Sequence, residues 1–136
     1  MRLPEIGEVN EKEYIVREED SPEFLARQGL GVLSTPRMIA LMEIVSKELL
    51  DRIIGDEYTS VGIHVDVYHK NPAPVGARLR FISRVVDVHG RKIVFEVKCL
   101  MGDKVIGEGM HERFIIEWRK LKEKIEALKK RMSSFL

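Results

Sequence analysis

Hydrophobic and polar residues recur along the chain in two distinct patterns, and the longest run with helical spacing lies between Thr35 and Gly55. Its apolar positions are Met38, Ile39, Met42, Val45, Leu49, Leu50 and Ile53. At about 100° per residue these side chains form one broad stripe, which is typical of an amphipathic helix packed on a core. Thr35 followed by Pro36 predicts the start of this helix, with Thr35 as its cap, and Gly55 predicts its end after about five turns.

One carboxylate, Glu43, lies at the edge of this stripe, beside Ile39 and Leu50. Charged side chains are seldom buried unless they are paired. Without other information the pattern therefore favours a rim glutamate whose carboxylate turns to water. The alternative is a half-buried carboxylate that is available for chemistry.

The second half of the chain alternates with a period of two, which predicts strands. A proline-rich stop at 71–76 and turn signals at His89-Gly90 and Gly102-Asp103 divide it into four consecutive antiparallel strands. A short β-like run at 14–16 precedes the helix. The clearest alternation is Ile93, Phe95, Val97, Cys99 and Met101. We therefore expect an α+β domain in which an antiparallel sheet wraps around one long helix.

The first of these four strands ends its apolar face on a histidine. Counting by twos from Val61 gives Ile63, Val65, Val67 and then His69. On strand phase alone, His69 is more simply a core histidine bonded to the backbone, because buried polar groups normally find partners. His64 falls on the opposite face, so a two-histidine metal site on this strand is not expected.

Two further amphipathic segments flank the predicted core. Ser21 and Pro22 predict a short capped turn of helix that ends at Gly29 and Gly31, and we interpret this segment as a flap. The tail carries apolar residues at alternating spacings of three and four: Trp118, Leu121, Ile125, Leu128 and Met132. It predicts a packing or subunit-contact helix at about 117–132. A membrane-surface role is the weaker alternative, because the stripe is narrow and glutamates dilute the positive charge.

Composition narrows the function classes. The 136 residues fit one domain, 1–136, with a core at about 12–117. With 23 basic and 22 acidic side chains, the chain shows no charge excess that would favour nucleic acid. A single cysteine, Cys99, excludes an internal disulfide and a cysteine metal cluster, and we expect it to pack in the core. We find neither a signal-peptide pattern nor a membrane span, so we expect a cytoplasmic protein.

Four sequence blocks together carry a resemblance to a known family. They are T-P-x-M-I-A-L-M-E at 35–43, S-V-G-x-x-V-D-V-x-H at 60–69, P-V-G at 74–76 and I-G-x-G-x-H-E-R at 106–113. In this order they resemble the fluoroacetyl-CoA thioesterase-like branch of the hotdog-fold superfamily, over roughly residues 20–117. The resemblance implies a hotdog fold, a homodimer or higher homo-oligomer, and hydrolysis of acyl-CoA thioesters at or near the dimer interface. Coenzyme A would enter only as part of the substrate, with no metal and no other cofactor.

Transferred to this sequence, the family's catalytic threonine, glutamate and histidine fall on Thr35, Glu43 and His69. The resemblance also implies substrate binding by the backbone amide near Gly62 and by Arg113. Thioester hydrolysis needs a base or nucleophile, and donors aimed at the developing oxyanion. Glu43 can serve as base for water or attack the acyl carbon directly, and the sequence leaves both open. A fourth histidine, His111, is assigned a structural role beside Glu112.

The chain departs from the family's founding enzyme in the flap. Ala26 and Gly29 occupy the positions of its lid phenylalanines, and Phe24 and Leu25 are the nearest large apolar side chains. We therefore do not expect selectivity for fluoroacetyl groups, and predict a thioesterase for a small or medium acyl-CoA whose acyl group the sequence does not identify. The alternatives are a non-catalytic acyl-CoA binding or regulatory module, and a hotdog hydratase or dehydratase.

Overall fold

The computed structural model describes residues 1–135. Five strands, three α-helices and one short 3-10 helix follow one another along this part of the chain: β1 (Val9–Ile15), η1 (Glu18–Asp20), α1 (Glu23–Ala26), α2 (Thr35–Ile54), β2 (Tyr58–His69), β3 (Arg78–His89), β4 (Lys92–Met101), β5 (Lys104–Glu117) and α3 (Trp118–Ser133). The two predicted turns, at His89-Gly90 and Gly102-Asp103, are confirmed as the β3–β4 and β4–β5 connections.

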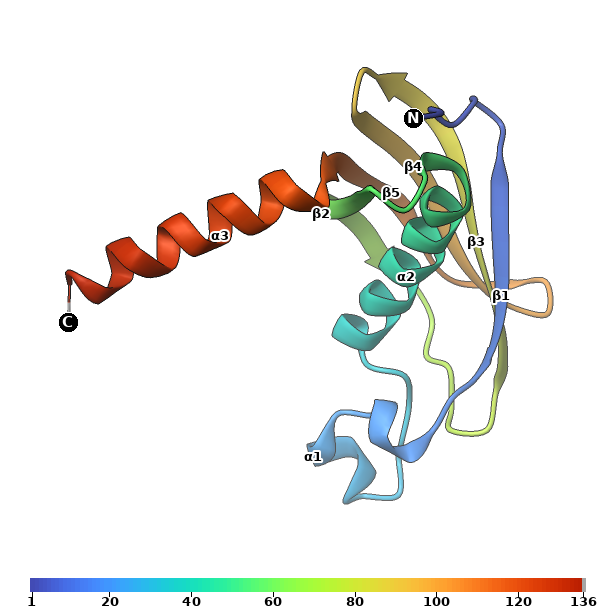
Figure 1. Ribbon diagram of the computed structural model, residues 1–136. Coiled ribbons are helices and arrows are strands. Elements are labelled where there is room, and N and C mark those ends of the chain that lie inside the picture. Colours follow the sequence, from blue (N-terminus) through green and yellow to red (C-terminus); the bar gives the residue numbers. More distant parts are fainter. Residues whose placement is uncertain (136) are drawn as a thin grey trace.

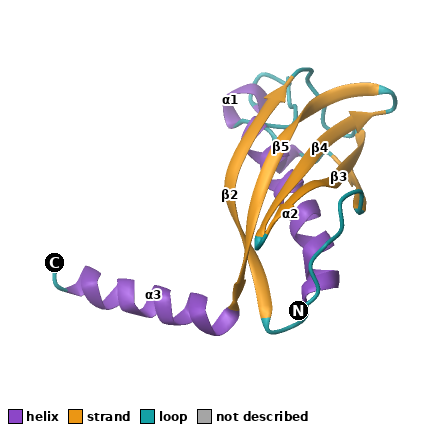
Figure 2. Cartoon of the chain, turned by 90° about the horizontal axis from the view of Figure 1, so that it is seen from above, coloured by secondary structure: helices purple, strands orange, loops and turns teal. Residues whose placement is uncertain are grey.

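The strands form one antiparallel sheet in the order β1-β3-β4-β5-β2, so that β1 and β2 are its two edges. The sheet curves around α2, which lies against its concave face (Figures 1 and 2). This arrangement confirms the predicted α+β hotdog architecture. The β-like run predicted at 14–16 corresponds to the end of β1, which is longer than predicted, begins at Val9 and pairs with β3 along seven residues.

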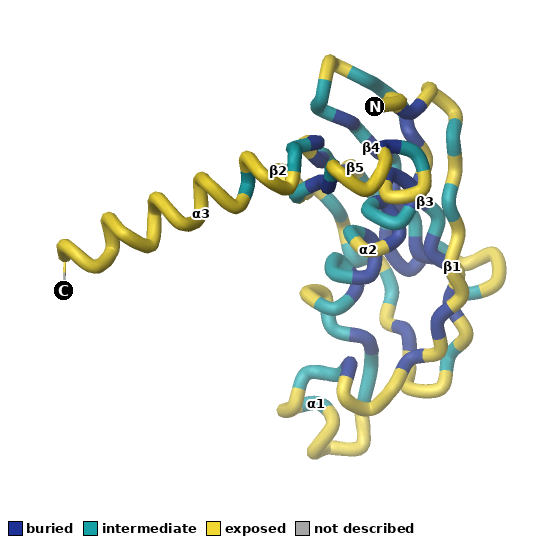
Figure 3. Tube along the Cα trace, viewed as in Figure 1, coloured by how far each residue is buried: buried dark blue, intermediate teal, exposed yellow. Residues whose placement is uncertain are grey.

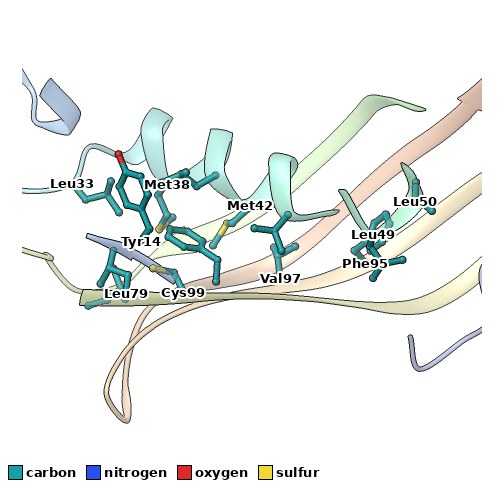
Figure 4. Close-up of a cluster of buried hydrophobic side chains, with 14 of the residues drawn as sticks. Tyr14, Leu33, Met38, Met42, Leu49, Leu50, Leu79, Phe95, Val97 and Cys99 are labelled. Atoms are coloured by element: carbon teal, nitrogen blue, oxygen red, sulfur yellow. The ribbon is translucent and has the colours of Figure 1, made fainter. Parts of the chain in front are cut away.

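The core fills the space between α2 and the sheet (Figure 4). The alternating side chains of β4 are buried as predicted from Ile93 to Cys99, and the Cys99 thiol is free. The buried stripe of α2 is rotated from the predicted one. Ile39 and Ile53 are only partly buried, whereas Leu41 and Ile54 are buried. Ser46 is buried as well and its hydroxyl lies 2.7 Å from that of Ser83 on β3, so α2 turns toward the sheet a side that the apolar pattern alone does not mark.

The start of α2 differs from the prediction by one residue. Ser34 is the cap, and its Oγ accepts a hydrogen bond from the backbone N–H of Arg37 at 3.2 Å. Thr35 is therefore the first helical residue and Pro36 the second. The predicted capping role of Thr35 is wrong, and its hydroxyl is free for another partner because Ser34 satisfies the helix terminus.

A similar correction applies to residues 17–32, which we call the flap. Helix α1 begins at Glu23 and has no side-chain cap, so the predicted capping role of Ser21 is also wrong. The Ser21 hydroxyl instead accepts a hydrogen bond from the backbone N–H of Val32 at 3.2 Å. This bond ties the two ends of the flap together. The flap lies beyond the first turn of α2, at the lower end of the molecule in Figure 1.

A β-bulge in β2 corrects the predicted alternation of this strand. The pairing with β5 shifts between Gly62 and His64, so that Ile63 is the extra residue and is 51% exposed. Beyond the bulge, Val65 and His69 face α2 as predicted. Before it, the inward positions are Ser60 and Gly62 rather than Val61. Side chains along a strand alternate between the two faces of the sheet. One extra residue at the bulge therefore places the side chains before it on the face opposite to the predicted one.

Helix α3 leaves the end of β5 and projects away from the rest of the molecule (Figures 1 and 3). None of its described residues is buried. Within residues 1–135, no helix is long and apolar enough to cross a membrane.

Candidate functional site

Two of the predicted site residues meet where α2 begins and β2 ends. The Oγ1 of Thr35 lies 2.7 Å from the Nδ1 of His69, which is a hydrogen bond. Thr35 is able to make this bond because Ser34 caps the helix in its place. His69 faces Thr35 because it occupies an inward position of β2, opposite Gly107 of β5. A side chain at Gly107 would collide with Met38, since an added Cβ would lie 2.5 Å from its sulfur.

The second ring nitrogen of His69, Nε2, is buried and has no hydrogen-bond partner among the described residues. Burial also lowers the pKa of His69 below its ordinary value of 6.5, so the neutral imidazole is the favoured form at neutral pH. An unpaired buried polar atom is costly unless a ligand or water satisfies it. His69 is therefore equipped to exchange a hydrogen bond or a proton with a bound molecule.

The flap covers this pair on one side. A cavity of about 300 Å³ is lined by residues of the flap, the start of α2 and the end of β2: Pro22, Leu25, Val32, Leu33, Ser34, Thr35, His69, Lys70, Asn71 and Pro72. Leu25 is the large apolar residue that α1 contributes to its wall. Phe24 is 68% exposed and does not line this cavity. Ala26 and Gly29 are exposed as well.

The other three predicted site residues gather further along α2. Glu43 faces Gly62 of β2, and its Oε1 lies 3.9 Å from the Nη1 of Arg113 on β5. A Cβ at Gly62 would lie 2.5 Å from that same Oε1, so no other residue fits without displacing the carboxylate. Arg113 is buried, whereas the Glu43 side chain is 39% exposed. The carboxylate is thus partly exposed, which corresponds to the alternative of a half-buried carboxylate and not to the favoured one that turns to water.

Two residues that sequence reasoning did not place in the site hold Arg113. Its Nε and Nη2 donate to the hydroxyl and the carbonyl of Ser60, both at 2.8 Å. Its Nη1 lies 3.2 Å from the Nε2 of His111. The Nδ1 of His111 lies 2.9 Å from the carbonyl of His64, which can only accept, so Nδ1 carries the proton and Nε2 accepts from Arg113. This bonding assigns the tautomer of His111.

The environment of these buried groups is consistent with that assignment. His111 is 1% exposed, and burial lowers its pKa below 6.5, with the neighbouring Arg113 adding to the effect. Burial lowers the pKa of Arg113 as well. Ser60 was hidden from the sequence pattern by the bulge. His111 had a usable signal, because it lies two residues before Arg113 on the same strand, and i and i+2 share one face.

The structure therefore arranges the predicted residues in two groups rather than one. Thr35 and Glu43 are eight residues apart on α2, which separates them by roughly 12 Å along the helix axis. Gly62 and His69 are seven residues apart on β2, or roughly 20 Å. We expected Thr35, Glu43 and His69 to converge on one thioester. Within a single chain, Thr35 pairs with His69, and Glu43 pairs with Gly62 and Arg113.

Two of the other histidines lie where the sequence indicated. His64 is on the outer face of the sheet, where its Nδ1 lies 3.5 Å from a carboxylate oxygen of Glu112. His89 lies at the β3–β4 turn, with its Nε2 2.7 Å from Asp87, and its side chain is 64% exposed. Neither imidazole contacts the two groups of site residues, and only the backbone carbonyl of His64 meets His111. They therefore serve as matched controls for substitutions of His69 and His111.

Comparison with known proteins supports a single family. The model of the family described as "FlK: Fluoroacetyl-CoA-specific thioesterase" matches residues 16–119. The fluoroacetyl-CoA thioesterase of Streptantibioticus cattleyicolor is 28% identical over 106 residues, which cover 78% of this chain and 75% of that enzyme.

Solved structures agree on the fold. A hypothetical protein of Thermus thermophilus, described as a thioesterase superfamily member, aligns with a TM-score of 0.88 at 25% identity, over 98% of this chain and 99% of that one. A variant of FlK solved with fluoroacetate and CoA gives a TM-score of 0.78 at 23% identity, over 87% of this chain and 99% of that one. Since the family model spans most of the chain, including both groups of site residues, this protein belongs to the FlK family of hotdog-fold thioesterases.

Proposed function

We propose that this protein is an acyl-CoA thioesterase, which hydrolyses a small or medium acyl-CoA to the free acid and coenzyme A. The observation that carries the proposal is the Glu43 carboxylate, held half-open beside Gly62 and the buried Arg113 on the helix side of the sheet. Family membership supports the same reaction. Coenzyme A enters as part of the substrate, and the reaction as proposed requires neither a metal ion nor another cofactor.

Glu43 supplies the reactive oxygen in this proposal. The carboxylate either deprotonates a water molecule that attacks the thioester carbonyl, or attacks the acyl carbon itself to form an anhydride that water then hydrolyses. In both routes negative charge develops on the thioester oxygen and must be stabilised by donors. The backbone N–H at Gly62 is the proposed donor, because the missing side chain leaves the backbone open beside Glu43.

Arg113 is proposed to contribute fixed positive charge to the same place. Ser60 and His111 hold its guanidinium through three hydrogen bonds, so it does not have to reorganise when charge develops. Thr35 and His69 are proposed to bind the thioester or to protonate the leaving sulfur. The neutral form of His69 leaves Nε2 free to accept or to donate, according to the tautomer that its bond with Thr35 selects.

A homodimer brings the two groups closer together. Strand β2 is a sheet edge, and an antiparallel partner strand can pair with its backbone groups. If two β2 edges pair about a two-fold axis, the His69 end of one strand lies beside the Tyr58 end of the other. Gly62 is only four residues from Tyr58. Glu43 of one copy would then lie nearer to His69 of the second copy than to its own.

The identity of the acyl group depends on the flap. Leu25 is the large apolar residue that it presents to the Thr35–His69 cavity, while Ala26 and Gly29 offer little apolar surface. This composition supports a pocket different from that of an enzyme specific for fluoroacetyl groups. We also propose a cytoplasmic location, since acyl-CoA thioesters are intracellular metabolites and the single cysteine is free and buried.

The test is a panel of short and medium acyl-CoAs in which free thiol is followed with time. We expect thiol release from at least one of them, and a loss of at least about a hundredfold in kcat/KM for Glu43→Gln and for His69→Asn. Glu48→Gln and His64→Asn are matched controls, because these side chains lie on the same helix and strand but outside both groups of site residues.

Two outcomes would favour the alternatives. Tight binding of an acyl-CoA without thiol release would indicate a binding or regulatory module. Addition of water to an enoyl-CoA, with the thioester intact, would indicate a hydratase. Either result would overturn the thioesterase proposal.

A further inference from the structure

Helix α3 exposes an apolar stripe that has no partner within the described part of the chain. Trp118 is 53% exposed and Met132 is 63% exposed, and Ile125 and Leu128 lie between them with nearly half of their surface accessible. The helix is about 24 Å long and points away from its own sheet (Figure 2). Such a stripe is stable in water mainly when another surface covers it.

The charges beside the stripe decide which surface can cover it. Lys122 and Lys129 flank it on one side, and Lys124 and Arg131 flank it on the other. Of the two glutamates of α3, Glu123 lies on the opposite face, whereas Glu126 lies beside Lys122 and Lys129. Pairing of α3 with α3 of another copy, parallel or antiparallel, would bring four basic side chains from each helix, offset by one glutamate, to the edges of the contact, which is unfavourable. The surface that covers α3 must therefore be apolar and acidic.

The rest of the chain has the complementary charge. Residues 118–136 contain seven basic and two acidic side chains, a net charge of +5. The whole chain has 23 basic and 22 acidic side chains, so residues 1–117 carry 16 and 20, a net charge of −4. A second copy of this chain thus offers the required sign of charge.

The flap has the required surface. Phe24 and Leu30 are 68% and 60% exposed, and the exposed glutamates Glu18, Glu19 and Glu23 belong to the same segment. Among residues 1–135, neither Glu18 nor Glu19 takes part in an ion pair. The outer face of the sheet fits less well, because its Glu108 is paired with Lys70 and its Glu112 with Lys92 and His64.

The two surfaces also lie at the appropriate ends of the molecule. Helix α3 starts beside Tyr58, which pairs with Glu117, whereas the flap borders the cavity at His69. In the proposed dimer with paired β2 edges, the Tyr58 end of one copy lies beside the His69 end of the other. Helix α3 therefore leaves its own sheet next to the flap of the second copy.

We infer that α3 is an exchanged arm, whose apolar stripe and basic flanks dock on the flap of a second copy of this chain. The docked arm would hold the flap over the Thr35–His69 pair of the second copy. This consequence for activity rests on the proposed function, whereas the contact itself can be measured without any substrate.

The first experiment is charge reversal with rescue, read by sedimentation equilibrium of the full chain. We expect Lys122→Glu with Lys129→Glu to raise the dimer dissociation constant by roughly tenfold or more. Adding Glu18→Lys and Glu19→Lys to that variant should restore most of the affinity. The control is Arg119→Glu with Lys130→Glu, which makes the same change of charge on the far face of α3 and should leave the dissociation constant within about threefold.

A second experiment applies if the dimer is too stable for its dissociation constant to be measured. Phe24→Cys combined with Leu128→Cys should give disulfide-linked dimers under mild oxidation, because the buried Cys99 does not compete. The control is Phe24→Cys combined with Lys130→Cys, which should not give disulfide-linked dimers. The inference would be overturned if neither rescue nor cross-linking is observed. It would also be overturned if the full chain binds anionic phosphatidylglycerol vesicles and the Lys122→Glu and Lys129→Glu changes abolish that binding. None of these results depends on whether the protein hydrolyses a thioester.

Discussion

At the scale of single residues, the site depends on one position that has no side chain. Glu43 Oε1 occupies the space where any other residue at Gly62 would place its Cβ. Glycine at this position leaves that space to the carboxylate, whereas a larger residue would push the Glu43 side chain aside. Gly62 is exposed on the edge strand β2, which supports the proposed role of its backbone N–H as a donor to the oxyanion.

Gly62→Ala should therefore inactivate the protein without unfolding it. The added methyl group displaces the Glu43 carboxylate and covers the backbone, so we expect kcat/KM to fall by about a hundredfold or more, as when an oxyanion donor is lost. Thiol release and circular dichroism measure the two effects. Ile63→Ala is the control, because the Ile63 side chain is exposed at the bulge. A Gly62→Ala protein with normal kcat/KM would remove Gly62 and Glu43 from the mechanism.

His69 gives a pH dependence whose sign follows from its burial. Its pKa is lowered from 6.5, so the neutral form predominates at and above pH 6.5, and protonation begins only at lower pH. If the neutral imidazole acts in the reaction, kcat/KM should fall as the pH decreases, with a midpoint below pH 6.5. A profile of kcat/KM against pH measures this. A midpoint above 6.5 would contradict the neutral-imidazole role.

At the scale of elements, α2 is joined to β3 by a polar contact inside the core. The hydroxyls of Ser46 and Ser83 lie 2.7 Å apart, and the Ser46 hydroxyl donates to the carbonyl of Met42 at 2.9 Å. The Ser83 hydroxyl then donates to Ser46. Both residues are buried, so this pair fixes how α2 is rotated against the sheet within an otherwise apolar interface.

The two single substitutions at this contact should have unequal effects. Ser46→Ala leaves the Ser83 hydroxyl without a partner and should lower the free energy of unfolding by about 1–3 kcal/mol. Ser83→Ala should cost less, because Ser46 keeps its bond to Met42. The double substitution should cost less than the sum of the two, since it removes both polar groups. Urea unfolding of the four proteins measures this, and additive effects would show that the hydroxyls are not coupled.

At the scale of the whole molecule, buried histidines link stability to pH. Burial lowers the pKa of His111 and of His69 below the value of about 6.5 in the unfolded chain, so the unfolded state binds more protons below that pH. The stabilisation is complete above pH 6.5 and is lost as the pH falls below it.

Urea unfolding should accordingly give a lower free energy of unfolding at pH 5.5 than at pH 7.5. His89→Gln should show the same decrease as the unsubstituted protein, because the His89 side chain is largely exposed. Equal stability at the two pH values would show that His111 and His69 are not held in their neutral forms.

The sequence by itself determined the elements and their broad arrangement, because local periodicity and turn residues act over a few positions. The helix that ends before Gly55, the alternation from Ile93 to Cys99 and the two hairpin turns follow directly from such patterns. The inward position of His69 could be predicted too, since it lies beyond the bulge. Candidate site residues came from the family resemblance, and their roles remain predictions.

Only the tertiary structure decided the positions that depend on contacts between distant segments. The bulge at Ile63 cannot be read from alternation, because one extra residue leaves no local signal, and it brings Ser60 and Gly62 to the inner face. The cap at Ser34 differs by one residue from the cap expected at Thr35, and this frees the hydroxyl that meets His69. The predicted helix already separates Thr35 from Glu43, and the tertiary structure decided that His69 meets the former and Gly62 the latter.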